Sequence, residues 1–223
     1  MFDITAIGEL LIDMAQSGMS DIGSPIFEAN PGGAPCNVLA MLNKLGRSTA
    51  FIGKVGDDIF GKKLKNIVES SGTDIGGLVF DENVRTTLAF VETDEYGDRN
   101  FSFYRAPGAD MMLREDEVNV DIIKQSRVLH FGTLSMTHDG VEKATVKAIE
   151  TAKDSDLLLS FDPNLRPPLW DSMDRAKRKI DYGCSVSDIV KIETDELRFL
   201  TGCDDTDKAV EMFKTRYPNV ALL

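Results

Sequence analysis

Gly32-Gly33-Ala34-Pro35-Cys36-Asn37 marks the place where an extended strand is expected to give way to a helix. Upstream, residues 2–9 have the apolar character of a buried strand. Downstream, residues 35–45 carry apolar side chains at helical spacing until Gly46 stops the helix. Paired glycines let backbone N–H groups approach a ligand closely, and a proline suits the first helical turn, where its missing N–H costs nothing. A lone pair of glycines equally fits a plain turn, so the wider pattern decides.

Short apolar strands alternate with amphipathic helices along most of the chain. The expected strands are residues 2–9, 49–55, 127–132, 157–162, 188–192 and 219–223, and the expected helices are residues 35–45, 58–71, 139–153, 171–182, 194–200 and 207–217. This order predicts an α/β fold in which a parallel sheet has helices on both faces.

Two segments, residues 10–29 and 86–105, interrupt the alternation because they are strand-forming but carry turn signals. In the first, Ser17-Gly18 and Gly23-Ser24-Pro25 predict turns, and in the second, residues 94–98 predict the turn of a β-hairpin. We expect both segments to form sheet outside the alternating unit. The alternative is two surface hairpins of no further consequence.

Net charge and cysteine content indicate which classes of partner and which cellular compartment the sequence favours. The 223 residues carry a net charge of −12 with a pI near 4.6, which argues against nucleic acid and anionic membranes as partners. Cys36, Cys184 and Cys203 follow no CxxC or secreted spacing, which predicts reduced thiols in a cytoplasmic protein. The start of the chain has Asp3 and no basic flank, so it does not resemble a signal peptide, and no apolar run reaches membrane-spanning length.

Further motifs accompany the glycine stretch. Gly8-Glu9-Leu10-Leu11-Ile12-Asp13 precedes it, residues 53–58 (GKVGDD) follow it, and Asp162-Pro163-Asn164-Leu165-Arg166-Pro167 comes later. Together these motifs resemble the PfkB (ribokinase-like) carbohydrate kinases, fructokinase subgroup, and the resemblance runs from residue 2 to the last residue. Leu39 departs from the small residue that is usual in the glycine signature.

The resemblance implies a ribokinase-like fold, with a parallel-rich sheet, helices on both faces and a small β lid formed by the inserted segments 10–29 and 86–105. Family members continue with a D-T-x-G-A-G-D-x-F segment, whose glycines form the anion hole and whose aspartate is the catalytic base. The 223 residues contain no such segment, so the resemblance implies an incomplete, C-terminally truncated domain over residues 1–223. The apolar end, residues 219–223, is expected to promote self-association.

The resemblance also assigns roles to residues that follow predicted strands, whose carboxyl ends meet at one edge of a parallel sheet. Sugar-binding residues would be Asp13, Gly32, Gly33, Asn37, Phe103 and Arg105, the last two in a lid that closes over the sugar. The residues facing ATP would be Asp162, Asn164 and Lys191. Glu196 would hold Mg²⁺ through water. Arg166 would neutralise the charge on the phosphoryl group during its transfer. A monovalent cation is a further candidate cofactor.

Each of these side chains also has a plainer interpretation. Asp13 fits a turn, Asn37 a helix-surface amide, Phe103 the core of a lid, and Arg166 an ordinary surface arginine. Glu196 belongs to an acidic helix start that the helix dipole alone favours. Glu193 departs from the Asn or Ser that the family often has there, so its role is open.

The leading hypothesis is an ATP-dependent sugar kinase of the fructokinase type, which transfers a phosphoryl group to a primary hydroxyl of a hexose. The sequence has neither GxxxxGK(S/T) nor GxGxxG, which argues against a P-loop or Rossmann site, and His130 fits a core or edge position in an apolar strand. Within the class the alternative is a 2-keto-3-deoxygluconate kinase. Outside it the alternative is a non-catalytic sugar-binding fragment. A homodimer through the lid is a further expectation.

Overall fold

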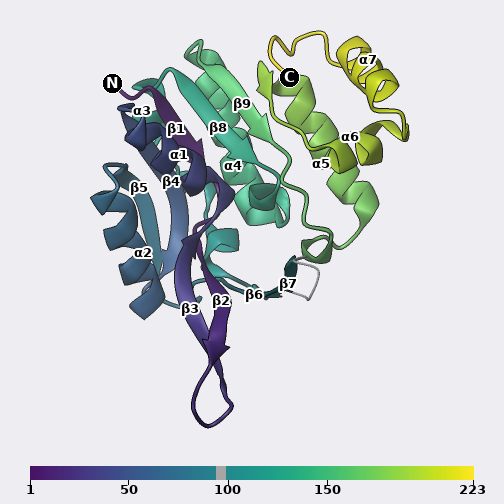
Figure 1. Ribbon diagram of the computed structural model, residues 1–223. Coiled ribbons are helices and arrows are strands. Elements are labelled where there is room, and N and C mark those ends of the chain that lie inside the picture. The colour runs from purple at the N-terminus through teal and green to yellow at the C-terminus, as the bar shows by residue number, and fades with distance from the viewer. Residues whose placement is uncertain (94–98) are drawn as a thin grey trace.

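Two sheets organise the chain in a computed structural model that describes residues 1–93 and 99–223 (Figure 1). Within these residues a six-stranded parallel sheet, in the order β10-β9-β8-β1-β4-β5, forms the body, and a four-stranded small sheet has the order β3-β2-β6-β7. The body strands are β1 (Ile4–Ile7), β4 (Thr49–Gly56), β5 (Asp74–Asp81), β8 (Val128–Gly132), β9 (Leu158–Asp162) and β10 (Ile189–Val190). The strands of the small sheet are β2 (Leu11–Met19), β3 (Pro25–Gly32), β6 (Leu88–Thr93) and β7 (Arg99–Tyr104).

Helices cover both faces of the body sheet, as the alternating pattern predicts (Figure 1). One face carries α1 (Ala34–Lys44) and α2 (Ile59–Ser70), the other carries α3 (Val120–Lys124), α4 (Asp139–Asp154) and α5 (Met173–Val186), and α6 (Thr194–Thr201) and α7 (Thr206–Arg216) follow α5. Side chains of β4 alternate between the two cores: Ile52 packs in the cluster with α4, whereas Phe51 packs in the cluster with α1 and α2. The sheet is therefore buried on both sides, which explains its nearly continuous apolar strands.

The small sheet unites the two segments that interrupt the alternation. Strands β2 and β3 form an antiparallel hairpin, β6 joins β2 in parallel, and β7 joins β6 antiparallel. Both segments therefore pair within one sheet, and its role as a lid stays a prediction. The predicted turn at residues 94–98 lies outside the described residues.

The turn predicted at Ser17-Gly18 is wrong. Both residues lie in β2, where a shift of register between Gln16 and Gly18 absorbs them without ending the strand. The chain turns instead next to the Gly23-Ser24-Pro25 signal, where Ser20 N–H donates to Ser24 O and Ser20 Oγ accepts from Ser24 N–H. The hairpin also extends beyond residue 29, because β3 continues to the first glycine of the pair.

Two elements were not predicted, and one was overestimated. Strand β5 contains Gly76 and Gly77 and begins and ends at aspartates, so its sequence resembles a loop. The short α3 has too few turns to show the spacing of about 3.6 residues between apolar side chains that predicts a helix. The predicted strand at residues 219–223 forms only an isolated bridge between Leu222 and Ile189. It follows Pro218, and the Asn219 side chain donates to the carbonyls of Cys184 and Ser187, which holds the backbone outside regular pairing.

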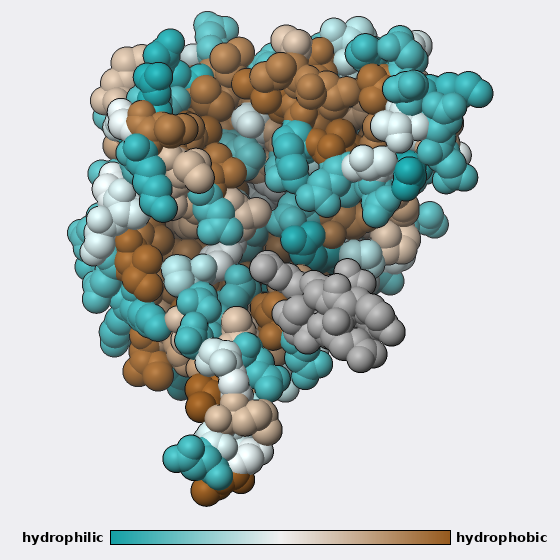
Figure 2. All heavy atoms as spheres, viewed as in Figure 1, coloured by the Kyte–Doolittle hydropathy of each residue, from teal (hydrophilic) through white to brown (hydrophobic). Residues whose placement is uncertain are grey.

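Apolar side chains gather across the upper part of the molecule in the view of Figure 2. Beside α1, residues of β1, β8, β9 and β10 line a groove of about 920 Å³, and Leu158 of β9 is 51% exposed. Self-association through residues 219–223 stays a prediction. None of the helices in the described part of the chain has the length and apolar character needed to cross a membrane.

Candidate functional site

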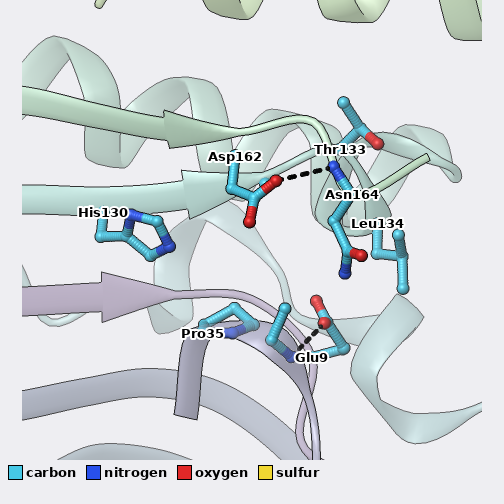
Figure 3. Close-up of a pocket in the computed structure, with 9 residues that line it drawn as sticks. Glu9, Pro35, His130, Thr133, Leu134, Asp162 and Asn164 are labelled. Atoms are coloured by element: carbon cyan, nitrogen blue, oxygen red, sulfur yellow. Dashed lines mark hydrogen bonds between the residues drawn. The ribbon is translucent and has the colours of Figure 1, made fainter. Parts of the chain in front are cut away.

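A polar pocket forms where three parallel strands of the body sheet end (Figure 3). Glu9 follows β1, Thr133 follows β8, and Asp162 ends β9, with Asn164 in the loop beyond it. Pro35 at the start of α1 closes the pocket from below in this view. The carboxyl edge of a parallel sheet is where ligands bind in open α/β folds, so this is the candidate active site.

The paired glycines link the small sheet to the body. Gly32 is the last residue of β3, and Gly33, with φ +117°, caps the start of α1. A Cβ at Gly32 would overlap the Asp13 carboxylate, and a Cβ at Gly33 would collide with the backbone carbonyl of Glu9. Gly33 therefore requires glycine, whereas a Cβ at Gly32 would need the Asp13 and Leu11 side chains to shift. The predicted passage from strand to helix is confirmed.

The sugar-binding residues expected around this turn lie on two elements. Asp13 of β2 lies against Gly32, whereas Asn37 is exposed on α1, beside a second small cavity that Gly32 also lines. Their contact with a sugar stays a prediction. The structure brings Asp13 and Gly32 together and places the Asn37 side chain one helical turn away from the polar pocket.

Glu9 lines the pocket, although the sequence analysis predicted no role for it. It is 3% exposed, and its Oε1 accepts the N–H of Ala34 at 2.9 Å. Desolvation raises the pKa of Glu9 from 4.5 to about 7, against the opposing effect of backbone hydrogen bonds. Because this pKa is raised, the stability that the neutral carboxyl contributes is fully present below pH 4.5 and is lost as the pH rises through about 7. A glutamate inside an otherwise apolar run was the sequence signal that could have identified it.

Asp162, Asn164 and Lys191, the residues expected to face ATP, lie together. The backbone N–H of Asn164 donates to Asp162 Oδ1 at 3.1 Å, and Lys191 Nζ lies 3.3 Å from Asp162 Oδ2 and 3.1 Å from Glu193 Oε1. Lys191 is largely exposed, so it retains access to solvent and to an anionic ligand. The arrangement supplies one cation and one carboxylate at the ends of adjacent strands.

Glu196 joins α6 to the loop after β9. Its Oε2 accepts the N–H of Glu193 at 2.9 Å, and its Oε1 accepts the N–H of Leu165 at 2.7 Å. Burial raises the pKa of Glu196, although these two backbone donors lower it. The plain interpretation as an acidic helix start is thus correct in part, because Glu193 and Glu196 form a capping box.

Replacing Glu196 with alanine is expected to lower the free energy of unfolding by about 2 kcal/mol, because two backbone donors lose a carboxylate acceptor. Asp195→Ala is the matched control, since Asp195 lies in the same turn, is exposed and only pairs with Arg198 at the surface. Urea denaturation of both variants measures the difference. Equal losses would show that the Glu196 hydrogen bonds contribute nothing to stability.

A magnesium ion fits this donor set only through water and a ligand's phosphates. Among the described residues no group of three or more His, Cys, Asp or Glu side chains is placed to hold a metal ion. Glu196 and Asp162 each keep carboxylate lone pairs beyond the hydrogen bonds they accept. Mg²⁺ retains several waters in sites of this kind, so two carboxylates suffice as outer ligands.

His130 occupies the buried strand position that its apolar surroundings predict. Its Nδ1 lies 3.0 Å from Ser160 Oγ on the neighbouring strand, and burial lowers its pKa, so the ring is neutral near pH 7. It also lines the pocket, to the left of Asp162 in Figure 3. A neutral, hydrogen-bonded ring there shapes the wall of the pocket.

Arg105 fastens the small sheet to the body. Its Nη2 lies 2.6 Å from Asp110 Oδ2, both side chains being 2% exposed, and its other donors reach Thr137 Oγ1 at 2.9 Å and Leu134 O at 3.0 Å. The hydroxyl of Thr87 donates to the second oxygen of Asp110. Protein groups therefore engage the guanidinium that was expected to close over the sugar, and its contact with a sugar stays a prediction. Asp110 had no role in the sequence interpretation.

Phe103 and Arg166 both lie close to Phe101 of β7. Phe103 stacks on Phe101 along β7 with ring centroids 5.9 Å apart, and the Arg166 guanidinium lies 5.7 Å from the centroid of Phe101. In the small sheet, Ala89 pairs with both Asp13 and Phe103, so these two side chains share one face. The expected sugar residues Asp13 and Phe103 thus face the side from which Arg166 approaches.

Comparison with known proteins gives a consistent result. A family model described as pfkB family carbohydrate kinase matches residues 1–222. The chain is 44% identical over 222 residues to fructokinase-1 of Zea mays, covering 99% of this chain and 68% of that protein. It is 44% identical over 206 residues to probable fructokinase-4 of Arabidopsis thaliana, covering 92% of this chain and 63% of that protein.

The solved structure of fructokinase with bound ATP from Xylella fastidiosa superposes with a TM-score of 0.87 at 29% identity, covering 100% of this chain and 67% of that one. The chain therefore spans 63–68% of the length of the relatives compared with it.

Proposed function

The chain belongs to the pfkB carbohydrate kinase family, and from this we propose that the protein transfers the γ-phosphoryl group of ATP to a primary hydroxyl of a hexose, in the manner of a fructokinase. One observation carries the proposal: the start of α1, directly after the expected sugar-binding glycines, and the expected ATP residues Asp162 and Asn164 line one pocket at the carboxyl edge of the body sheet. The similarity to fructokinases and to an ATP-bound fructokinase supports it.

On the sugar side, the Asp13 carboxylate would accept hydroxyl donors, and the glycine turn would present backbone N–H groups to hydroxyl oxygens. Phe103 would cover an apolar face of the ring, and Asn37 would reach the sugar from α1. The small sheet would act as a lid and as the contact of a homodimer. We also propose that the protein works in the cytoplasm, in keeping with its acidic charge and its free cysteines.

On the phosphate side, Arg166 and Lys191 would neutralise charge that develops as the phosphoryl group moves, while Asp162 and Asn164 shape the loop that presents Arg166. Mg²⁺, when bound, would supply charge neutralisation on the phosphates, with Glu196 and Asp162 as outer ligands through water. Phosphoryl transfer depends mainly on such positioning and electrostatics, which this set of residues can provide.

The direct test mixes a chain extended through a D-T-x-G-A-G-D-x-F segment with ATP, Mg²⁺, K⁺ and fructose and measures sugar phosphate and ADP. We expect turnover on fructose with a higher kcat/KM than on 2-keto-3-deoxygluconate, and omission of K⁺ tests the monovalent cation. A higher kcat/KM on the keto acid would favour the alternative kinase. Turnover on neither sugar would contradict a kinase of this type.

Sugar binding without phosphoryl transfer is a second candidate, favoured by the 63–68% of the relatives' length that the chain spans. Calorimetry of the 223-residue chain with fructose separates the two. Fructose binding without ADP release would support the second candidate, and phosphorylated sugar above a no-enzyme blank would contradict it.

Arg166→Ala is expected to lower kcat by about 10²-fold while changing the KM for fructose little, because charge on the phosphoryl group develops in the transition state. Arg178→Ala, which removes an exposed arginine of α5, is the control and should leave both constants unchanged. Steady-state kinetics of both variants, made in the extended chain of the direct test, measure kcat and the KM for fructose. A larger change in KM than in kcat would place Arg166 at the sugar instead.

A further inference from the structure

Glu9 stands where three parts of the molecule meet. It follows β1 of the body and precedes β2 of the small sheet, and its carboxylate binds the first residue of α1 through Ala34 N–H. Its backbone carbonyl also lies against Gly33, so both ends of the residue touch the glycine turn. A displacement of Glu9 would therefore move the turn that forms one side of the pocket.

Charged groups face Glu9 from each element packed around it. Arg105 and Asp110, the pair that fastens the small sheet, act on it electrostatically with opposite sign, and Asp110 has the larger effect. From α1, Cys36 lies close enough that Glu9 contributes to the raised pKa of its thiol, after burial. Across the pocket lie His130 and Asp162. In Figure 3 the Glu9 carboxylate points into the pocket, toward the side chain of Asn164.

We propose that Glu9 is a positioning residue: its carboxylate holds the paired-glycine turn at the side of the pocket. The part of this proposal that concerns sugar binding by the turn rests on the proposed function. The hold of Glu9 on the turn does not. The hydrogen bond from Ala34 N–H to the Glu9 carboxylate supplies the hold.

A purely structural role would favour an uncharged residue here. Ionised Glu9 opposes folding above neutral pH, since its pKa is raised to about 7 by burial. A glutamine would keep the acceptor for Ala34 N–H without that cost. An acid at this position therefore gains from its charge, which strengthens the hydrogen bond to the turn.

The experiment follows the backbone amides of Gly33, Ala34 and Thr87 by NMR of the 223-residue chain as the pH rises. In the wild type, all three amide shifts should titrate with one midpoint near 7. Glu9→Gln should abolish this midpoint, and Glu28→Gln, which removes an exposed acid of β3, should leave it unchanged. Glu9→Ala should lose protection of the Ala34 amide from hydrogen exchange, and Glu9→Gln should restore it. Turn amides that do not titrate, or that titrate equally in Glu9→Gln, would overturn the proposal.

Calorimetry with fructose completes the test. The wild type should bind fructose about 3-fold more weakly at about pH 6 than at about pH 8, whereas Glu9→Gln should bind equally at both. Equal wild-type affinities would also overturn the proposal. If the turn titrates but the wild type binds no fructose, the proposed sugar is wrong and Glu9 still positions the turn. If fructose binds but the turn does not titrate, the proposal for Glu9 is wrong and the proposed function stands.

Discussion

Arg105→Ala is expected to lower the free energy of unfolding by about 3–5 kcal/mol, because it leaves the Asp110 carboxylate buried without its cation. Both side chains are 2% exposed, so water cannot replace the lost partner. The carbonyl of Leu134 and the hydroxyl of Thr137 also lose a donor. The small sheet should then detach more readily from the body.

Urea denaturation of Arg105→Ala measures this loss. Arg198→Ala is the control, because Arg198 makes an exposed ion pair with Asp195 and should change stability by less than about 1 kcal/mol. The double variant Arg105→Met with Asp110→Leu should be more stable than Arg105→Ala, since no unpaired charge is left buried. A loss below about 1 kcal/mol in Arg105→Ala would show that Asp110 finds water or becomes neutral.

The same arginine distinguishes a structural link from a sugar contact. Arg105→Lys keeps one charge but cannot reach Asp110, Thr137 and Leu134 together. If the small sheet is a lid over the sugar, this variant should raise the KM for fructose more than the KM for ATP. Equal changes in both constants would mean that Arg105 acts only on the stability of the sheet.

Motifs with a local physical cause could be predicted from the sequence. The glycine pair and the proline after it fix a turn and a helix start within a few residues, and the structure has both. The same holds for Asp162, whose strand ends at a proline, and for the acidic start of α6. The spacing of apolar residues also predicted the parallel sheet and its two helical layers. Burial on both faces makes the strands of such a sheet nearly continuous in apolar residues.

Features that depend on pairing between distant segments could not be predicted in the same way. The parallel pairing of β2 with β6 joins residues far apart in the chain, and no local signal specifies it. Arg105 and Asp110 are close in sequence, but their burial depends on Leu134 and Thr137, which belong to the body. Glu9 likewise acquires its role only when Ala34 folds back onto it. The roles of such residues come from tertiary contacts.

Gly33→Ala is expected to lower the free energy of unfolding by about 3–5 kcal/mol and to weaken fructose binding strongly, because two penalties coincide at this position. The backbone has φ +117°, which a residue with a Cβ rarely adopts. The added Cβ would also collide with the backbone carbonyl of Glu9, which cannot rotate away as a side chain could.

Two other glycines separate these penalties. Gly46 also has a positive φ, +76°, but open space around its Cβ position, so Gly46→Ala should cost only about 1 kcal/mol from backbone strain. Gly18 lies in β2 with open space and no positive φ, so Gly18→Ala should be close to neutral. Urea denaturation and fructose calorimetry of the three variants give the comparison. A Gly33→Ala chain no less stable than Gly46→Ala, with wild-type affinity for fructose, would show that the turn relaxes away from Glu9 and does not shape the sugar side of the pocket.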